Sequence, residues 1–278
     1  MRNIFVFILV IFLSSCDETT NVEKGRMLPE HMEYSYDCLI TNSSASKINS
    51  FLKKADDMLN EIASDKINIT DREQSEYGEK FYKEARKDKS LKINNNDQLN
   101  TKLNLILTDL LRVRSNPSSI KYKIYLLDDP KMVNAFTVGG QIFVSRGIMN
   151  KCKNDDQLYA IIGHEVGHNE KGHIKLFLQQ LKASEEYFGD WGNSLVMIKK
   201  FITMSFNQKK ELEADYYGID LTWKLGFDVC AIKSFWDELA RSENHNLFED
   251  MFRSHPYSDL RSQCLKNHIE SNFNQICK

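Results

Sequence analysis

Hydrophobic residues recur at helical spacing in three stretches of the N-terminal half of the chain. Apolar side chains three and four positions apart lie on one face of a helix, so this spacing predicts amphipathic helices. The predicted helices cover 45–63, 71–89 and 99–113. Asn116-Pro117-Ser118-Ser119 ends the pattern, because proline and small polar residues favour a loop.

Short apolar runs follow between residues 122 and 145, and β-branched and aromatic residues are frequent in them. Asp128-Asp129-Pro130 and Gly139-Gly140 separate these runs with residues that favour turns. The pattern therefore predicts three short strands, at 122–127, 133–138 and 141–145.

Helical spacing returns after residue 155 and continues to the C-terminal region, with glycine or proline at most joints. The predicted helices are 155–169, 174–188, 194–205, 209–225, 232–241 and 258–273. The stretch 195–206 is apolar, but it is short and contains Lys199 and Lys200, which favours a docked helix or lid over a membrane span. The complete pattern predicts an α+β fold that is mainly helical and has a small three-stranded sheet.

The first sixteen residues have the pattern of an export signal. Arg2 precedes the apolar run 4–13, which is too short to span a bilayer and typical of a signal peptide. Leu13-Ser14-Ser15-Cys16 resembles the lipobox of bacterial lipoproteins, in which the cysteine is lipidated and becomes the mature N-terminus. An ordinary signal peptide with a chance cysteine is the alternative. We predict a lipid anchor at Cys16 in the cell envelope, with the outer membrane favoured and the leaflet left open.

The predicted organisation has four parts: a signal peptide at 1–16, a flexible tether at 17–42, a helical N-terminal subdomain at 43–116 and a catalytic core at 117–278. A chain of 278 residues can bury one sizeable core. The formal net charge is −2, with both signs interspersed, which argues against a nucleic-acid partner.

Five cysteines remain after Cys16, an odd number for an oxidising compartment. One or two disulfides are expected there, with at least one thiol left unpaired. The spacing does not say which cysteines pair, and no C-x-x-C motif favours zinc binding. The five are Cys38, Cys152, Cys230, Cys264 and Cys277.

The strongest chemical signal is His164-Glu165-Val166-Gly167-His168, an H-E-x-x-H motif inside a predicted helix. Two histidines four residues apart share one helix face and can hold one Zn²⁺. Glu165 is then placed to take a proton from a water at the metal. The motif predicts a zinc hydrolase with one zinc ion per chain.

A catalytic zinc site needs a third protein ligand. A third histidine at the metzincin spacing is absent, because Lys171 and Ile174 occupy the required positions. His173 lies well round the helix from the ligand face, so a polar contact at the helix end is its ordinary interpretation. Glu211 is the better candidate, with Asp215 one turn later to fix the tautomer of a ligand histidine. A solvated helix face is the alternative for this acidic pair.

Several motifs, in this order, resemble the HtpX-like gluzincin metallopeptidases, a family that also contains the CAAX prenyl proteases. The resemblance covers about half of the chain and implies a zincin-like domain whose sheet lies beside the H-E-x-x-H helix. The long apolar spans of the membrane-embedded members are missing, so the chain is similar to the soluble lipoprotein branch. The motifs are Asn134-Ala135-Phe136, Gly139-Gly140, Ile142, Val144, Gly147, His164 to His168, Glu211 to Asp215, His255-Pro256 and Arg261.

The resemblance implies further roles. His255 would lie near the metal, where it stabilises the oxyanion or occupies the open position in a latent state, and Arg261 would anchor its loop; a helix cap is the alternative for both. An extended substrate would pair with a strand edge formed by Asn134, Ala135, Phe136, Gly140, Gln141 and Ile142, although Phe136 and Ile142 fit a sheet core equally well.

The sequence therefore predicts a lipid-anchored zinc endopeptidase of the bacterial envelope that degrades misfolded or misassembled proteins. An envelope chaperone or assembly factor with a latent zinc site is the alternative. Prenyl-type processing is disfavoured, because that activity belongs to the membrane-embedded members of the family.

Overall fold

The computed structural model describes residues 25–39, 67–88, 91–95, 98–188, 202–241, 251, 254–256 and 259–277. The predicted signal peptide with Cys16, the predicted helix 45–63 and most of the predicted helix 194–205 lie outside these ranges. No helix within them is long and apolar enough to cross a membrane.

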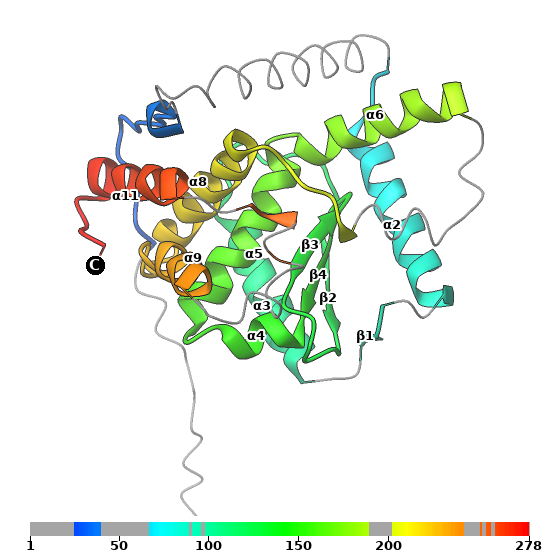
Figure 1. Cartoon of the computed structure of the whole chain (residues 1–278), viewed down its shortest axis with the longest axis horizontal. Helices are drawn as coiled ribbons and strands as arrows, with labels where there is room; N and C mark the ends of the chain where they lie inside the picture. Colours follow the sequence, from blue (N-terminus) through cyan, green and yellow to red (C-terminus); the bar gives the residue numbers. More distant parts are fainter. Residues whose placement is uncertain are drawn as a thin grey trace, which may run out of the picture.

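A mixed sheet of four strands lies at the centre of the fold, in the order β1-β2-β4-β3 (Figure 1). β2 (Lys123–Leu127) runs parallel to β4 (Gln141–Ser145), and β3 (Ala135–Val138) pairs antiparallel with β4. The three predicted strands are confirmed. The two-residue strand β1 (Ile93–Asn94), which was not predicted, pairs with β2 and makes the sheet one strand wider. β3 is left at the opposite edge.

Alternate strand residues enter two hydrophobic clusters, because successive side chains point to opposite faces of a sheet. Ile124 and Val144 belong to the larger cluster, with α3 (Leu99–Arg112) and α5 (Asp155–Glu170). Tyr125 and Phe143 belong to the other, with α2 (Asp71–Asp88) and α6 (His173–Phe188). The sheet therefore separates two helical layers.

Helix α5 is the most buried of the described helices, with every residue from Gln157 to Asn169 buried. The side chain of Asn154 caps its start by accepting a hydrogen bond from the Gln157 amide. Asp155 and Asp156 in the first turn complement the helix dipole. These signals fix where the helix begins, and so which of its residues reach the centre of the protein.

Helix α8 (Gln208–Lys224) packs against α5 at unusually short range. A Cβ atom added to Gly167 would lie 2.8 Å from the Ala214 carbonyl oxygen, and one added to Gly218 would lie 2.8 Å from the His164 amide nitrogen. Both distances are too short for a side chain, so glycine is required here for close approach. The glycines bring the start of α8 beside the histidines of α5.

The other helices complete the layer around α5 and α8: α4 (Arg146–Lys151), α9 (Ala231–Arg241), α11 (Asp259–Phe273) and the 3₁₀ turn η1 (Asp37–Leu39). The described helices that the periodicity predicted begin and end within one residue of their predicted bounds. The short elements α4 and η1 were not predicted, since neither is long enough to show a repeat.

Residues 25–39 lie along α8 and α11, although the sequence assigned them to a flexible tether. Tyr34 donates a hydrogen bond to Asp220 at 2.6 Å, and the His268 and Asn272 side chains contact the Glu33 carbonyl. Ordering this segment costs conformational entropy, which these contacts offset. The mixed polar composition of this segment shows no hydrophobic spacing from which its packing could be predicted.

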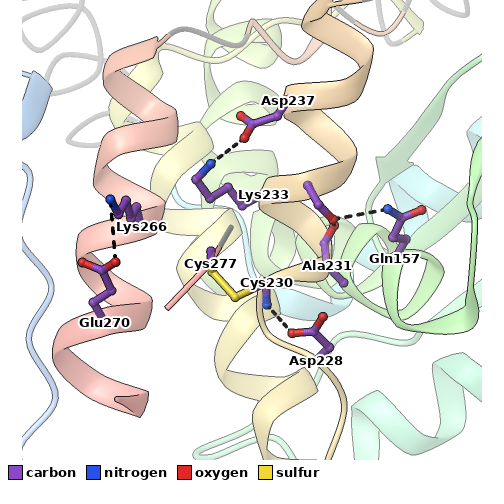
Figure 2. The surroundings of a disulfide bond; sticks show 10 residues. Gln157, Asp228, Cys230, Ala231, Lys233, Asp237, Lys266, Glu270 and Cys277 are labelled. Carbon is purple, nitrogen blue, oxygen red and sulfur yellow. Dashed lines mark hydrogen bonds and ion pairs between the residues drawn. A yellow bond between two sulfur atoms is a disulfide. The ribbon is translucent and has the colours of Figure 1, made fainter. Parts of the chain in front are cut away.

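Two disulfides and one free cysteine occur among the described cysteines, as the odd count predicted. Cys38 pairs with Cys264 and ties residues 25–39 to α11. Cys230 pairs with Cys277 and joins the C-terminal segment to the residue before α9 (Figure 2). Cys152 is the free thiol.

Candidate metal centre

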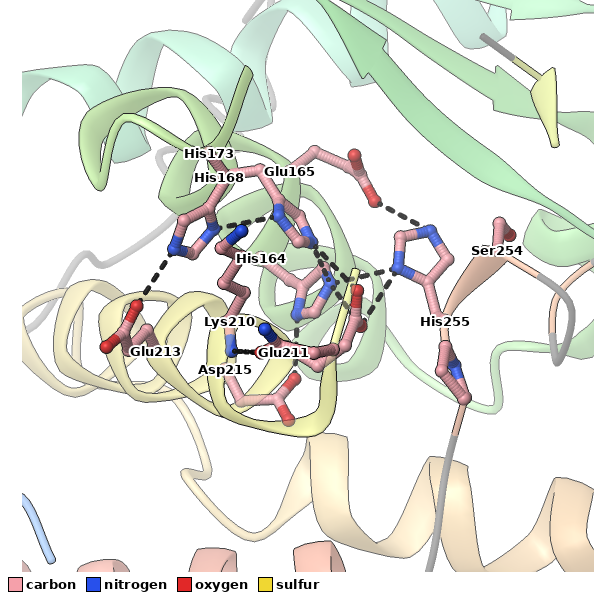
Figure 3. Close-up of polar contacts among 12 residues, drawn as sticks. His164, Glu165, His168, His173, Lys210, Glu211, Glu213, Asp215, Ser254 and His255 are labelled. Atoms are coloured by element: carbon pink, nitrogen blue, oxygen red, sulfur yellow. Dashed lines mark hydrogen bonds and ion pairs between the residues drawn. The ribbon is translucent and has the colours of Figure 1, made fainter. Parts of the chain in front are cut away.

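Two imidazoles from α5 meet at the centre of the protein (Figure 3). His164 and His168 are one helical turn apart, and their Nε2 atoms lie 2.9 Å from each other. Both side chains are almost fully buried. Two lone pairs at this distance repel unless a proton or a cation lies between them, so the pair has the arrangement of a metal-binding site.

Glu211 in the first turn of α8 brings a carboxylate to the same point. One oxygen lies 3.5 Å from His164 Nε2, and the other lies 3.5 Å from His168 Nε2. Burial alone would raise the pKa of Glu211, but His255, Arg261 and His168 hold it well below its ordinary value. Glu211 is therefore ionised.

His255 supplies a fourth donor from the short segment 254–256. Its Nδ1 lies 3.2 Å from His164 Nε2 and 3.2 Å from Glu211 Oε2. Its Nε2 lies 3.1 Å from the carbonyl oxygen of Ala135 in β3. If Nε2 carries the ring proton and donates it to that carbonyl, Nδ1 is free to face the other donors.

The four donor groups fit zinc in type and in spacing. Their ligand atoms all lie within 4.8 Å of one another. Tetrahedral zinc with ordinary bond lengths separates its ligand atoms by about 3.3 Å, close to the 2.9 to 3.5 Å seen for the neighbouring pairs. Within the described part of the chain, Glu211 Oε1 is buried and makes no hydrogen bond. A cation among these atoms would satisfy it.

Asp215 and Arg261 form a second layer behind the donors. The Asp215 carboxylate accepts a hydrogen bond of 2.7 Å from His164 Nδ1, which orients the ring so that Nε2 faces the other donors. Burial opposes a charge on His164, but Asp215 raises its pKa to about 10. Arg261 donates to Asp215 at 2.6 Å, to the Pro256 carbonyl at 3.0 Å and contacts Glu211 at 3.1 Å. Arg261 thus joins α8 to the loop of His255.

Glu165 lies beside the donor group without belonging to it. It is buried, and its Oε1 lies 3.5 Å from His255 Nε2 but makes no hydrogen bond among the described residues. Burial raises the pKa of Glu165 above its ordinary value. A carboxylate with a raised pKa and a free oxygen is suited to accept a proton.

The six predicted substrate-binding residues divide into three pairs. Asn134 and Ala135 lie next to the donor site, because Ser254 Oγ contacts Asn134 Oδ1 at 3.2 Å and His255 contacts the Ala135 carbonyl. Gln141 and Ile142 lie on β4, whose backbone already pairs with β2 and β3 on its two sides. They cannot offer a free strand edge, so among the predicted residues only those of the β3 segment can.

The two remaining members of that predicted set do not reach the donors. Phe136 packs against Phe143 in the cluster on the far face of the sheet. The Gly140 amide donates to Asn169 at the end of α5, and the Asn169 side chain also donates to Thr137. Asn169 therefore holds the β3–β4 turn against α5, a role that the sequence analysis did not find.

His173 is not one of the four converging donors, but its ring lies directly behind His168. His173 directly follows Gly172, which has a positive φ and ends α5. This glycine is the sequence signal for the contact with His168, and a continuous helix through residue 173 would not predict it.

The family model of peptidase family M48 matches residues 97–269, which include every residue of this site. The chain belongs to peptidase family M48. The gluzincin metallopeptidase family inferred from the motifs is thus confirmed. Zinc is the metal of M48 peptidases, in agreement with the donors found here.

Curated M48 proteins align with the same part of the chain. The metalloprotease LoiP of Escherichia coli is 30% identical over 169 residues, which cover 56% of this chain and 65% of LoiP. The mitochondrial metalloendopeptidase OMA1 of Schizosaccharomyces pombe is 30% identical over 53% of this chain and 46% of its own. The beta-barrel assembly-enhancing protease of Yersinia pestis is 25% identical over 56% of this chain and 36% of its own. The chain spans less than two thirds of the length of each.

Proposed function

We propose that the protein is a zinc-dependent endopeptidase that cleaves unfolded or misassembled proteins of the bacterial cell envelope. The observation that carries the proposal is the buried convergence of His164, His168 and Glu211 beside Glu165. Membership of family M48 and its metalloprotease relatives support the reaction class.

His164, His168 and Glu211 would hold the zinc ion. When bound, zinc would polarise the scissile carbonyl and lower the pKa of a water molecule to about 7. Glu165 takes one proton from the attacking water and later delivers it to the departing amine nitrogen. Its buried position and raised pKa suit both transfers.

The free edge of β3 would align the substrate. An extended peptide can add as a further strand there, since β4 covers only the other side of β3. The Ala135 carbonyl belongs to this edge and is now in contact with His255. A substrate that pairs with it would displace the His255 side chain, which is then free to donate to the developing oxyanion.

A chaperone or assembly factor with a latent site is the second candidate. His255 supports it, because its Nδ1 fills the fourth position of the donor set while its Nε2 binds the strand edge. A catalytic zinc site needs that position open. The relative named a beta-barrel assembly-enhancing protease is consistent with such work in the envelope.

We place the protein at a membrane surface through lipidation of Cys16, with the outer membrane favoured. The lipobox-like Leu13-Ser14-Ser15-Cys16 after a short apolar run supports this anchor. Mass spectrometry of the mature N-terminus, compared with a C16S variant, tests the modification.

The deciding experiment is cleavage of an unfolded outer-membrane protein by the purified protein, its E165Q variant and an E238Q control. Wild type should cleave, lose activity with a chelator and recover with zinc. E165Q should bind zinc as wild type does but lose activity by about a factor of 10² to 10⁴, because the proton acceptor is gone. E238Q alters an exposed ion pair remote from the donors and should behave as wild type.

Wild-type rates in zinc-loaded E165Q would contradict the assignment of Glu165. The wild-type protein could fail to cleave the substrate both with and without zinc, while E165Q prevents aggregation of the substrate as well as wild type does. That result would favour the chaperone or assembly factor.

A further inference from the structure

A chain of polar contacts runs from His168 through His173 to Glu213 (Figure 3). The Nδ1 atoms of the two rings lie 3.1 Å apart. On its other side, His173 Nε2 lies 2.9 Å from Glu213 Oε2. His173 is 4% exposed, whereas the Glu213 side chain is 25% exposed and also lies near Lys209.

The turn between α5 and α6 creates this contact. In a continuous helix, a residue five positions after His168 would lie about 140° round the axis and could not face its ring. The chain instead turns at Gly172, which has φ +77°, and a new helix, α6, begins at His173. Phe206 stacks on the His168 ring and lies against the His173 ring in a tilted arrangement, so it packs against both imidazoles.

The chain of contacts has one consistent arrangement of protons when the rings are neutral. His168 Nε2 faces the metal donors without a proton, so its Nδ1 carries the proton and donates to His173 Nδ1. His173 must then carry its own proton on Nε2, which donates to Glu213. The reverse assignment would leave an unprotonated Nε2 against a carboxylate oxygen at 2.9 Å, where the two repel.

We propose that His173 and Glu213 are positioning residues for the metal, which fix the tautomer and orientation of His168 through two hydrogen bonds. The inference rests on the proposed zinc site. It makes the two histidine ligands unlike each other: Asp215 orients His164 directly, whereas Glu213 orients His168 through an intervening imidazole. Neither His173 nor Glu213 belongs to the four residues whose ligand atoms converge on the metal site.

The test is zinc affinity, measured by competition with a chromogenic chelator on the full chain. H173L removes the acceptor for the His168 proton, whereas H173N keeps an oxygen close to where Nδ1 lies. H173L should bind zinc about 10- to 100-fold more weakly than wild type, the range known for partners of metal-bound histidines, and H173N should stay close to wild type.

Glu213 provides a second pair of variants, E213A and E213Q, at a partly exposed position. This pair still tests the inference if H173L does not fold. E213A should weaken zinc binding, and E213Q, which keeps an acceptor oxygen, should restore most of it. Urea unfolding of the metal-free proteins separates lost affinity from lost stability.

The outcomes are distinct. If H173L and E213A fold and bind zinc as tightly as wild type, this inference is wrong, but the proposed function is unaffected. If H173N binds zinc as weakly as H173L, the inference is also wrong, because the size of the imidazole and not its hydrogen bond would then determine the affinity. A wild-type protein that binds no zinc overturns both this inference and the proposed function.

Discussion

Arg261 is a guanidinium with no exposed surface, placed between two buried carboxylates. A buried charge that loses its partner keeps the full cost of its removal from water. R261M should therefore lower the free energy of unfolding of the metal-free protein by about 3 to 5 kcal/mol, because Glu211 and Asp215 lose their shared cation.

Urea unfolding measures this loss, and R72M is the matched control. Arg72 pairs with Glu76, but its side chain is 83% exposed. Exposed pairs contribute about 0 to 1 kcal/mol, so the R72M curve should lie near that of wild type. Equal losses in the two variants would contradict a special role for Arg261.

His255 contacts both the metal donors and the strand edge, so its removal should separate binding from catalysis. H255A should bind an extended substrate more tightly, with a lower KM, because the Ala135 carbonyl and the fourth position are vacated. Its kcat should fall by about 10² to 10³, the usual effect of losing an oxyanion donor.

Steady-state kinetics on a fluorogenic peptide measures both constants. S254A, in the same segment, is the control for a general disturbance of the loop. If kcat and KM are unchanged in H255A, His255 takes no part in substrate binding or catalysis.

At the scale of elements, α2 is held by Asp71, whose carboxylate accepts hydrogen bonds from Lys175 of α6 and from Ser119. The hydrogen bond from Lys175, with those from Ser119, lowers the pKa of Asp71 below 3.8. Since the unfolded chain keeps the higher pKa, this stabilisation is complete above that value and is lost as pH falls through the folded-state pKa.

D71N should therefore flatten the acid side of the stability curve. Urea midpoints measured from about pH 5 down to pH 2 should fall less steeply in D71N than in wild type. K175M removes the main donor and should flatten the same region in part. Parallel curves for wild type and D71N would contradict the assignment.

Elements with a repeating pattern could be predicted from the sequence, and those made by a single contact could not. The bounds of α3 and β4 follow from hydrophobic spacing, and the start of α5 follows from the Asn154 cap and the acidic first turn. β1 has only two residues, and its pairing with β2 depends on tertiary position.

The same distinction applies to the site. His164, His168, Glu211 and Asp215 follow from residue type and from i, i+4 spacing. The role of His173 depends on the turn at Gly172, which ends α5, whereas the sequence analysis placed His173 on a continuous helix. The interior position of β4 depends on strand order, and the sequence pattern does not specify strand order.

At the scale of the whole molecule, the Cys38–Cys264 disulfide closes a loop of 226 residues in sequence separation. A cross-link over such a span removes much of the entropy of the unfolded chain, which stabilises the fold by about 2 to 5 kcal/mol. C38A and C264A should each lower the free energy of unfolding by that amount, measured in urea.

The two variants remove the same bond, so similar losses are expected from both. C152A keeps both disulfides and is the control. A loss confined to C264A would point to side-chain packing in α11 instead of the cross-link.

The path of residues 25–39 has a mechanical consequence. Tension applied from the N-terminal side would first act on hydrogen bonds such as that between Arg26 and Lys224, which can detach one after another. Beyond Cys38 the load would pass through a covalent bond into α11, one helical turn from Arg261. Arg261 joins this part of α11 to the carboxylates of Glu211 and Asp215, so a force on the N-terminal segment would reach the donor site through these ion pairs.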